Sequence, residues 1–293
     1  MTERGERAIQ QKHPLVQEAQ TNDELEKIEI TLLLEGIYRK YGYDFRNYNY
    51  PAIRRRIWHR IRIEKMHTIS ALQEKVLHDP AMMEKLFGDF SINVTEMFRD
   101  PSFFLAFRQK IVPALRELPF IRIWHAGCST GQEVFSMAIL LHEEGLLSKT
   151  RLYATDMNEQ VLKKASKGIF PLQKMQLYTK NYLRAGGKRA FSEYYHVKKD
   201  TVQFQSFLRD NMVFAQHNLV TDRSFNEFHT IICRNVMIYF NHSLQDHVHQ
   251  LFYESLCTNG FLGLGDKEGV VFTTHANGYE EVDGTEKLYR KLQ

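Results

Sequence analysis

The sequence predicts an α/β protein in which an open parallel sheet is preceded by a small all-helical domain. Beyond residue 100, short apolar segments typical of strands alternate with amphipathic segments typical of helices, the pattern of a parallel sheet covered by helices. Before residue 91 only helical periodicity is present. With 293 residues, of which 43% are hydrophobic, the chain is long enough for one large and one small domain.

The first 90 residues are expected to form a tail and four helices. Residues 1–20 are polar without an apolar period and should form a mobile tail, followed by a helical domain over residues 21–90. A helix is expected from Asn22, a good N-cap residue, to Gly42, which can close it in the left-handed conformation. Its predicted apolar face consists of Leu25, Ile28, Leu32, Leu33 and Ile37. Weaker helices are predicted at about 70–78 and 80–88.

A further helix, beginning at Pro51, gathers basic side chains on one surface. Ile53, Ile57 and Ile61 recur every four residues and should face the core. The remaining arc carries Arg55, Arg56, His59, Arg60 and Arg62. Such an arc can be an ordinary solvated helix face. Because arginine is used almost to the exclusion of lysine, and only Glu64 offers local compensation, we expect contact with an anionic macromolecule.

The second domain, residues 91–293, is expected to carry the sheet. Strands are predicted at 121–126, 151–155, 212–216, 228–233 and 261–264, and helices at 132–145, 158–167 and 242–257. Between about 170 and 205 the alternation is interrupted by an aromatic, basic stretch with a Gly186-Gly187 turn. This stretch indicates a small inserted unit.

Small or polar residues follow four of the predicted strands. They are the loop Ala126–Gly131, Asp156, Asn218 and the pair Arg234-Asn235. The carboxyl ends of parallel strands share one edge of the sheet, where ligands of open α/β sheets bind. The sequence therefore predicts a small-molecule site at this edge.

The loop Ala126–Gly131 and Asp156 narrow the class of ligand. The loop lacks the lysine of a phosphate-binding P-loop and has Ser129 where a dinucleotide site has its second glycine. Asp156 ends the next strand, where a carboxylate can accept hydrogen bonds from ribose hydroxyls. A ribose-bearing cofactor without a pyrophosphate fits best, which favours S-adenosylmethionine. Taken singly each signal has a structural alternative: Asp156 can cap a helix, and Asn218 can be a turn residue.

Composition excludes several other classes of protein. The three cysteines, Cys128, Cys233 and Cys257, are scattered, so neither a disulfide framework nor a metal site is expected. The longest apolar runs are much shorter than the roughly 20 residues of a membrane span, and the N-terminus has no signal-peptide core. We therefore expect a cytoplasmic protein that is not inserted in a membrane.

Five segments in order resemble the motifs of the CheR family, the chemotaxis-receptor glutamate O-methyltransferases. The segments are 91–100 (SINVTEMFRD), 126–133 (AGCSTGQE), 154–156 (ATD), 217–219 (HNL) and 232–240 (ICRNVMIYF). The resemblance extends over nearly all of residues 25–270. It implies a Rossmann-like, S-adenosylmethionine-dependent methyltransferase sheet, with a helical N-terminal domain and an inserted antiparallel β-subdomain at about 170–205.

The resemblance also implies a role for individual residues. Asn93, Thr95 and Arg99 would close over the cofactor from the interdomain linker. Arg99 and Tyr239 would lie at the methyl-transfer centre. The other implied cofactor contacts are Ala126 and Gly127 with the methionine part, Glu133 with its amino group, Asp156 with the ribose, Asn218 and Leu219 with the adenine, and Arg234 and Asn235 along the pocket.

The implied reaction forms a glutamyl methyl ester and S-adenosylhomocysteine on a chemotaxis receptor. The arginine-rich helix would dock on the receptor's acidic helical bundle, and the inserted subdomain would in some members bind a receptor C-terminal pentapeptide. The family's common Gly-His-Ser-Glu reads Gly265-Asp266-Lys267-Glu268 here, so the substrate side departs from the pattern. The alternative is a non-catalytic, S-adenosylmethionine-responsive protein that binds a receptor or scaffold. Nucleic-acid methylation is disfavoured, because Arg234-Asn235-Val236-Met237 stands where an amine-methylating Asp/Asn-Pro-Pro-Tyr motif would lie.

Overall fold

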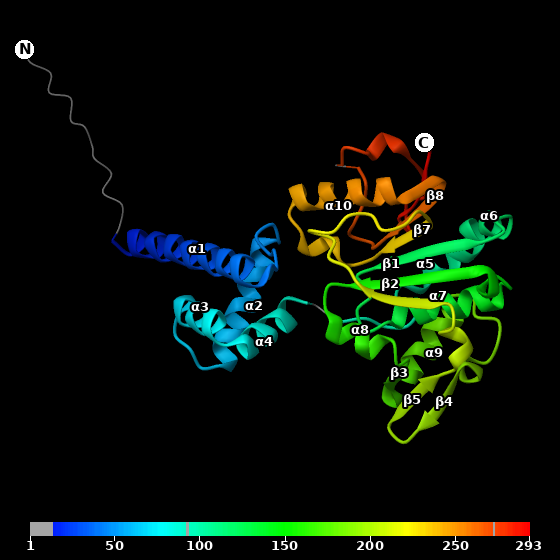
Figure 1. Cartoon of the computed structure of the whole chain (residues 1–293), viewed down its shortest axis with the longest axis horizontal. Helices are drawn as coiled ribbons and strands as arrows, with labels where there is room; N and C mark the ends of the chain where they lie inside the picture. The colour runs from blue at the N-terminus through cyan, green and yellow to red at the C-terminus, as the bar shows by residue number, and fades with distance from the viewer. Residues whose placement is uncertain (1–13, 92–93, 272) are drawn as a thin grey trace, which may run out of the picture. The chain divides into compact units, whose positions relative to one another are not determined.

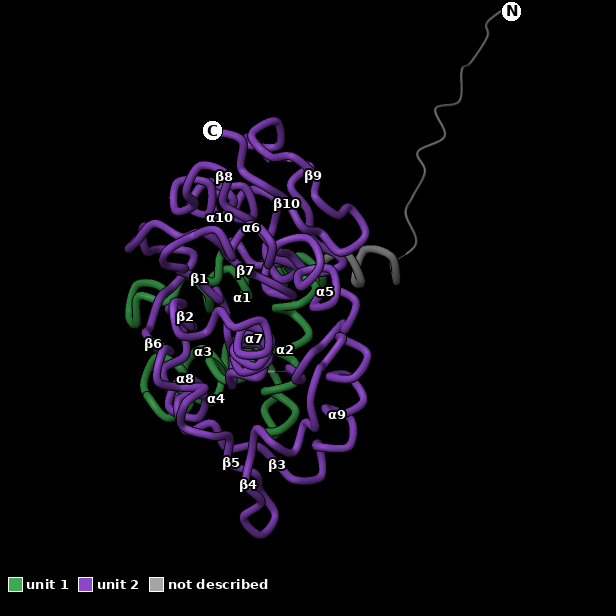
Figure 2. The backbone as a smooth tube through the Cα atoms, turned by 90° about the vertical axis from the view of Figure 1, so that its right-hand side faces the viewer, with its two compact units in different colours: residues 1–46, 50–90 green, residues 47–49, 91–293 purple. Residues whose placement is uncertain are grey.

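A computed structural model describes residues 14–91, 94–271 and 273–293, and the side chains from residue 22 onward. The chain forms two compact units (Figure 2), one of residues 1–46 and 50–90 and the other of residues 47–49 and 91–293. The tail predicted for residues 1–20 falls largely on residues 1–13, which lie outside the described residues, as does Asn93. Among the described residues, none of the helices combines the length and the apolar character that a bilayer crossing requires.

The smaller unit consists of helices (Figure 1), as predicted. They are α1 (Pro14–Tyr41), α2 (Tyr50–Ile63), α3 (Ile69–His78) and α4 (Pro80–Phe90). Gly42 closes α1 with a φ of +77° and donates its N–H to the carbonyl of Tyr38 at 2.9 Å, as expected of a left-handed C-terminal residue. The predicted start at Asn22 is wrong, because the helix begins at Pro14, and proline is well suited to the first turn of a helix.

The predicted apolar face of α1 is only half right. Leu33 and Ile37 are buried, but Leu25, Ile28 and Leu32 are each more than half exposed. The buried face is completed by Ile30 and Leu34. The helix carries two apolar stripes on opposite sides, and both satisfy the spacing of an amphipathic helix. Periodicity alone therefore could not show which stripe packs against α3.

The basic residues of α2 fall into two groups in the structure, one exposed and one in contact with Asp89. Ile53, Ile57 and Ile61 are buried as predicted, and Arg55, His59 and Arg62 are exposed. Arg60 instead forms a two-pronged contact with Asp89, at 2.7 and 2.9 Å, and its side chain is only 11% exposed. Arg56 also turns to this partner and donates to the carbonyl of Asp89. Arg56 and Arg60 are thus only partly exposed and are held by Asp89, a residue far away in sequence, and the docking role of the five basic residues stays a prediction.

The larger unit is built on a seven-stranded sheet of order β6-β2-β1-β7-β8-β10-β9. The strands are β1 (Ile121–Ala126), β2 (Thr150–Asp156), β6 (Met212–Gln216), β7 (Phe228–Cys233), β8 (Leu256–Leu264), β9 (Tyr279–Asp283) and β10 (Leu288–Lys291). The first five strands in the sheet order run parallel, and β10 and β9 add an antiparallel edge. The predicted α/β class with a parallel sheet is confirmed, although the antiparallel edge was not predicted.

Helices cover both faces of this sheet. They are α5 (Pro101–Ala106), a π-helical turn (Phe107–Ile111), α6 (Val112–Arg116), α7 (Gln132–Glu143), α8 (Glu159–Ala165) and α10 (His242–Ser255). Side chains of β1 alternate between the two faces: Ile121 and Ile123 pack into the core that contains α7, whereas Trp124 and Ala126 pack into the core that contains α10. The central strand β1 is thus buried on both faces. Polar groups can gather at its carboxyl end.

The predicted insert is a separate small antiparallel sheet of order β3-β5-β4. Its elements are β3 (Ile169–Pro171), α9 (Met175–Arg184), β4 (Tyr195–Lys198) and β5 (Thr201–Phe204). The insert shares the hydrophobic core of α7 and β1, and one buried carboxylate on α7, Glu143, adds polar contacts to it. Glu143 accepts hydrogen bonds from the hydroxyls of Tyr182 and Tyr194 and from the N–H of Lys188, and it pairs with Arg108 at 2.8 Å.

A buried histidine on α10 is expected to make the larger unit sensitive to acid. His249 is 1% exposed, and burial lowers its pKa to about 4, although Asp246 and a backbone hydrogen bond with Gly269 act to raise it. In the unfolded chain the pKa is about 6.5. The unfolded state therefore gains a proton first, and stability should be lost as the pH falls from about 6.5 towards 4, by about 3 kcal/mol.

Urea unfolding at pH 7 and pH 4.5 measures this loss. His249→Gln should unfold with a smaller difference between the two pH values than the wild type, because glutamine does not titrate. An identical difference in both proteins would show that other groups cause the acid sensitivity.

Candidate active site

The four predicted strand ends share one edge of the sheet. β6, β2, β1 and β7 are consecutive and parallel, so the loops after them lie next to one another. The structure therefore brings together the segments that contain Gly127, Asp156, Asn218 and Arg234. This arrangement confirms the expectation drawn from their place after the strands.

The loop after β1 approaches its neighbours closely at Gly127. The N–H groups of Gly127 and Cys128 both donate to the carbonyl of Thr155 on β2, at 2.9 and 2.8 Å. Gly127 has a φ of +76°, and a Cβ at this position would lie 2.5 Å from Cγ2 of Val236 in the loop after β7. Only glycine suits this backbone conformation and this approach.

Asp156, at the end of β2, also holds the loop after β1. Its two carboxylate oxygens accept the N–H groups of Ser129 and Asn158, each at 2.9 Å. The cap of the following helix is Asn158, whose side chain accepts the N–H of Gln160, so the alternative role of Asp156 as a helix cap is wrong. Burial raises the pKa of Asp156, and the backbone N–H groups act to lower it. A carboxylate has about four acceptor positions, so acceptor capacity remains for a ligand hydroxyl.

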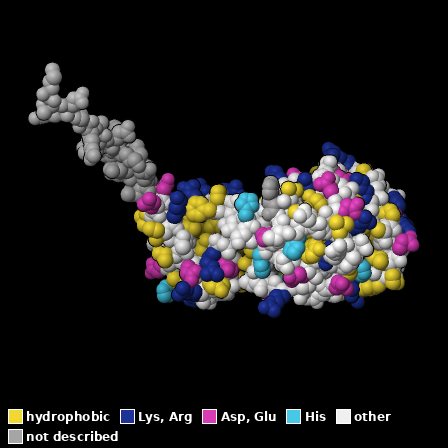
Figure 3. All heavy atoms as spheres, turned by 90° about the horizontal axis from the view of Figure 1, so that it is seen from above, with side chains coloured by type: hydrophobic (Ala, Val, Ile, Leu, Met, Phe, Trp, Pro, Cys, Tyr) yellow, Lys and Arg dark blue, Asp and Glu magenta, His cyan; other side chains and the backbone are white. Residues whose placement is uncertain are grey.

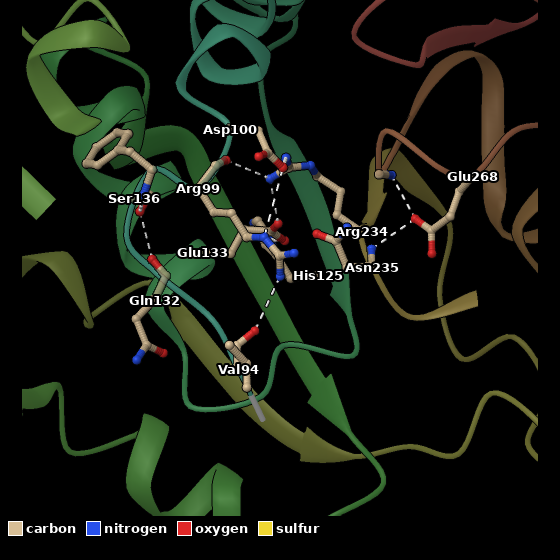
Figure 4. A network of polar contacts seen from close by, with 12 residues as sticks. Val94, Arg99, Asp100, His125, Gln132, Glu133, Ser136, Arg234, Asn235 and Glu268 are labelled. Atoms are coloured by element: carbon tan, nitrogen blue, oxygen red, sulfur yellow. Dashed lines mark hydrogen bonds and ion pairs between the residues drawn. The ribbon is translucent and has the colours of Figure 1, made fainter. Parts of the chain in front are cut away.

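A network of charged side chains connects the ends of β1 and β7 with the linker (Figure 4). Its centre is Arg234, whose side chain is 2% exposed. Arg234 pairs with Asp100 at 2.7 Å and with Glu133 at 3.2 Å, and it donates to the carbonyl of Arg99 at 3.2 Å. Its guanidinium also lies 4.1 Å from the centre of the Phe103 ring. The second oxygen of Glu133 lies 3.0 Å from Nδ1 of His125.

This network keeps Glu133 ionised. Burial acts to raise the pKa of Glu133, but the hydrogen bond with His125 and the charge of Arg234 outweigh it, and the pKa is lowered. A buried pair of this kind is expensive to break, because removal of one partner leaves the other charge uncompensated. The site thus presents a fixed negative group at the start of α7.

The linker before α5 is anchored next to this network and carries Arg99. The N–H of Phe98 donates to Oγ of Ser136 on α7 at 2.8 Å, and Ser136 donates in turn to the carbonyl of Gln132 at 2.7 Å. The side chain of Arg99 is 38% exposed and donates to the carbonyl of Val94 at 3.3 Å. The backbone at Arg99 is therefore fixed while its guanidinium remains accessible.

A carboxylate that was not among the predicted site residues organises the loop after β7. Glu268 is 7% exposed and accepts the N–H groups of five residues at 2.7 to 3.3 Å. These residues are Gly265, Asn235, Val236, Met237 and Ile238. Asn235 has a φ of +60°, so the carboxylate holds the chain in a conformation that few residues adopt. Burial raises the pKa of Glu268, and the N–H donors act to lower it.

The other predicted site residues have less defined surroundings. Asn218 accepts the N–H of Val220 at 3.0 Å with its side chain, as a turn residue does, and Leu219 is buried beside Trp124 and Ala126. Thr95 is partly exposed. Asp266 and Lys267, which depart from the family pattern, are exposed, whereas the adjacent Glu268 is buried.

Sequence reasoning missed Asp100 and His125 as members of the network, and Glu268 as its neighbour. Asp100 stands inside a recognised motif, and His125 is a polar residue near the end of an apolar strand. Those two signals were available. Glu268 also stood in a quoted motif, as the retained last residue of Gly265–Glu268, but its role was missed because four of its five partners are backbone groups about 30 residues earlier in the chain.

Comparison with known families decides what this arrangement is. Residues 93–288 match the model of the CheR methyltransferase SAM-binding domain, and residues 28–91 match that of the CheR methyltransferase all-alpha domain. The chain belongs to the CheR methyltransferase family. As a CheR methyltransferase it uses S-adenosylmethionine as its cofactor.

Individual relatives agree with this assignment. The chain is 51% identical over 271 residues to a protein of Pseudomonas putida described as putative methyltransferase Cher3, covering 92% of this chain and 99% of that one. It is 29% identical over 237 residues to a chemotaxis protein methyltransferase of Listeria monocytogenes, covering 80% and 87% of the two chains. A solved SAM-dependent methyltransferase of Geobacter sulfurreducens with S-adenosylhomocysteine covers 59% of this chain and 51% of its own at 13% identity and a TM-score of 0.33, a likeness too slight to add to the assignment.

The residues of the CheR site fit the cofactor. Gly127 allows the backbone approach that a bound methionine group requires, Glu133 offers a negative charge for its ammonium, and Asp156 keeps acceptor capacity for a ribose hydroxyl. These three assignments of individual contacts remain predictions.

Asp156→Ala should weaken the binding of S-adenosylhomocysteine by about tenfold to a hundredfold, since a hydrogen bond to a charged acceptor is lost. Calorimetric titration measures this effect, and the unfolding midpoint shows whether the loop of Ser129 has been disturbed as well. Asp200→Ala, in the exposed hairpin of the insert, is the matched control. An unaltered titration for Asp156→Ala would contradict the ribose assignment.

Proposed function

We propose that this CheR-family enzyme transfers the methyl group of S-adenosylmethionine to glutamate side chains on the cytoplasmic helical bundle of chemotaxis receptors. The observation that carries the proposal is the network of Figure 4, which leaves the cation of Arg99 accessible beside a fixed anionic site. The relatives described as chemotaxis protein methyltransferases support the choice of substrate.

The reaction requires little acid–base chemistry. When bound, S-adenosylmethionine supplies an electrophilic methyl group on a sulfonium sulfur, and its loss leaves the neutral thioether S-adenosylhomocysteine. A glutamate side chain has a pKa of about 4.3 and is ionised at neutral pH, so its oxygen can form the new bond to carbon without loss of a proton. Positioning of the two reactants and exclusion of water should therefore provide most of the rate.

Arg99 and Tyr239 are suited to this positioning. The guanidinium of Arg99 can hold the incoming carboxylate with paired hydrogen bonds, and its backbone is fixed by Arg234. Tyr239 lies in a single turn of 3₁₀ helix, Met237–Tyr239, in which Glu268 accepts the N–H groups of the first two residues. The phenol of Tyr239 can orient the carboxylate or the methyl group.

The exposed part of the arginine arc supports an acidic partner. Arg54, Arg55, Trp58 and Arg62 line a shallow hollow on α2. In the space-filling view, Lys and Arg side chains lie next to hydrophobic ones on the helical unit (Figure 3). Guanidinium groups around an aromatic ring suit a helix that presents carboxylates between apolar side chains, which is the chemistry of the proposed receptor bundle.

The inserted subdomain offers a second place for the receptor. A hollow beside β4 is lined by Arg189, Tyr194, Tyr195 and His142 among others, and both charge and aromatic surface are available there. We propose that this surface binds the receptor's C-terminal peptide in those receptors that have one. Methylation of a receptor with and without its last five residues tests this part, and equal rates would contradict it.

Charge reversal on α2 tests the docking face. Arg55→Glu combined with Arg62→Glu should lower receptor methylation at low salt by about tenfold or more, because steering by charged surfaces changes association rates on this scale. The difference should shrink above physiological salt, where screening acts over about 8 Å or less. Lys164→Glu with Lys167→Glu, in and after α8, makes the same change in net charge on exposed residues. An equal loss of receptor methylation in both double variants would show that the docking face is not on α2.

The activity itself is tested with the purified protein, methyl-labelled S-adenosylmethionine and receptor-containing membranes. We expect label in receptor protein that is released as methanol by mild base, since carboxyl methyl esters hydrolyse under these conditions. Label that resists base would indicate N-methylation instead. Binding of receptor and cofactor without transfer would favour the non-catalytic alternative.

A further inference from the structure

Three residues of the connector between α1 and α2 belong to the methyltransferase unit. The chain leaves the helical unit after Arg46 and re-enters it at Tyr50, and residues 47–49 in between are part of the larger unit. We call residues 47–49 the strap. Its backbone forms two hydrogen bonds with the end of the 3₁₀ turn: the N–H of Asn49 donates to the carbonyl of Tyr239 at 2.7 Å, and the N–H of Asn241 donates to the carbonyl of Asn47 at 2.9 Å.

Side chains add to this short antiparallel pairing, which is centred on Tyr48 and Phe240. Their rings lie 5.0 Å apart in an edge-to-face arrangement, a favourable geometry for aromatic pairs. The hydroxyl of Tyr48 lies 3.6 Å from Sδ of Met157, the residue after Asp156. The amide of Asn241 donates to Oδ1 of Asn47 at 3.3 Å. The strap thus contacts the loops after both β2 and β7.

The strap contacts the carbonyl of Tyr239, which the other residues that hold the turn do not. Glu268 accepts the N–H groups before Tyr239, and the side-chain amide of Gln245 donates to the carbonyls of Met237 and Phe240 at 3.0 and 3.1 Å. Glu268 and Gln245 therefore hold the turn on either side of Tyr239 but do not contact its own carbonyl. Asn49 supplies that contact.

We propose that the strap positions Tyr239 for methyl transfer, and that it couples the proposed docking helix to the active site. The coupling follows from the chain itself, because α2 begins at Tyr50, the residue directly after Asn49. A displacement of the first turn of α2 when a partner binds pulls on the hydrogen bond that holds the carbonyl of Tyr239. This inference rests on the proposed function, in which Tyr239 acts at the transfer step.

Three variants separate the contacts of the strap. Tyr48→Ala removes the ring that packs on Phe240, and Tyr48→Phe keeps the ring and removes the hydroxyl that contacts Met157. Asn49→Pro removes the N–H that donates to Tyr239 and keeps the Tyr48 ring. We expect Tyr48→Ala and Asn49→Pro to lower kcat for receptor methylation by about tenfold with KM for S-adenosylmethionine within twofold, as for loss of a contact that matters in the transition state. Tyr48→Phe should restore most of kcat.

Hydrogen exchange provides a readout that does not depend on activity. In Tyr48→Ala and Asn49→Pro, the amide of Asn241 should exchange faster than in the wild type, whereas amides of β7 should be unchanged. Unchanged exchange and unchanged kcat in both variants would overturn the proposal, and so would a rise in KM for the cofactor at constant kcat. If the wild type transfers no methyl group to receptors, the proposed function fails, and the exchange data alone still decide whether the strap holds the turn.

Discussion

Replacing Glu268 with glutamine should lower turnover by about a hundredfold and the free energy of unfolding by about 2 to 4 kcal/mol. The carboxylate accepts five backbone N–H groups, from Gly265 and from residues 235–238. A glutamine side chain offers one oxygen, and its NH2 group would face donors that then lose their acceptor. Each buried donor left unsatisfied costs about 1 to 3 kcal/mol, partly recovered by rearrangement. The loop that carries Arg234, Asn235 and Tyr239 would have to move.

Urea unfolding and a methylation assay together measure this effect. Asp266→Asn is the matched control, since it makes the same chemical change two residues away on an exposed side chain. We expect the control to resemble the wild type in both measurements. A Glu268→Gln protein with normal turnover and normal stability would show that the loop keeps its shape without the carboxylate.

Arg99→Ala should suppress turnover by about a hundredfold or more while the affinity for S-adenosylhomocysteine changes only a few-fold. A hundredfold corresponds to about 3 kcal/mol of transition-state stabilisation, which is within the range for a hydrogen-bonded ion pair to a reacting carboxylate. The binding of the cofactor should change little, because Arg234 holds Arg99 through its backbone carbonyl, and the Arg99 side chain has only a long contact of 4.0 Å with Asp100 of the network.

Single-turnover kinetics and calorimetric titration separate the two effects. Arg99→Lys keeps the charge but not the planar fork and should fall between the wild type and Arg99→Ala. Arg184→Ala, on the exposed face of α9, is the control for the loss of a surface arginine. An unchanged rate in Arg99→Ala would remove this residue from the mechanism.

The parts of the fold that local pattern determines were predicted from the sequence. β1, β2, β6 and β7 are short apolar segments between turn residues, and their carboxyl ends lie together because parallel strands permit no other arrangement. The insert was recognised because it interrupts the alternation. The antiparallel edge of β9 and β10 was not, since its pairing with β8 depends on contacts between distant segments.

Contacts between residues that are distant in sequence also explain the errors in the site and in the helical unit. Arg60 was expected at the surface because Asp89, its partner, is 29 residues away in sequence. Glu268 was missed because the groups that it binds are backbone N–H groups, which every residue carries. The two apolar stripes of α1 satisfy the same period, and only packing shows that Leu33 and Ile37 rather than Leu25 and Leu32 face the core.

The attachment of the insert through Glu143 has a consequence for how this enzyme can diversify. Its strands form a sheet of their own, and the hydroxyls of Tyr182 and Tyr194 and the N–H of Lys188 converge on that one carboxylate of α7. A module of different sequence can replace the insert only if it also fills the aromatic core that Phe170 and Phe204 share with Phe135 of α7. The catalytic scaffold can thus acquire new recognition surfaces without any alteration of the strands that seat its cofactor.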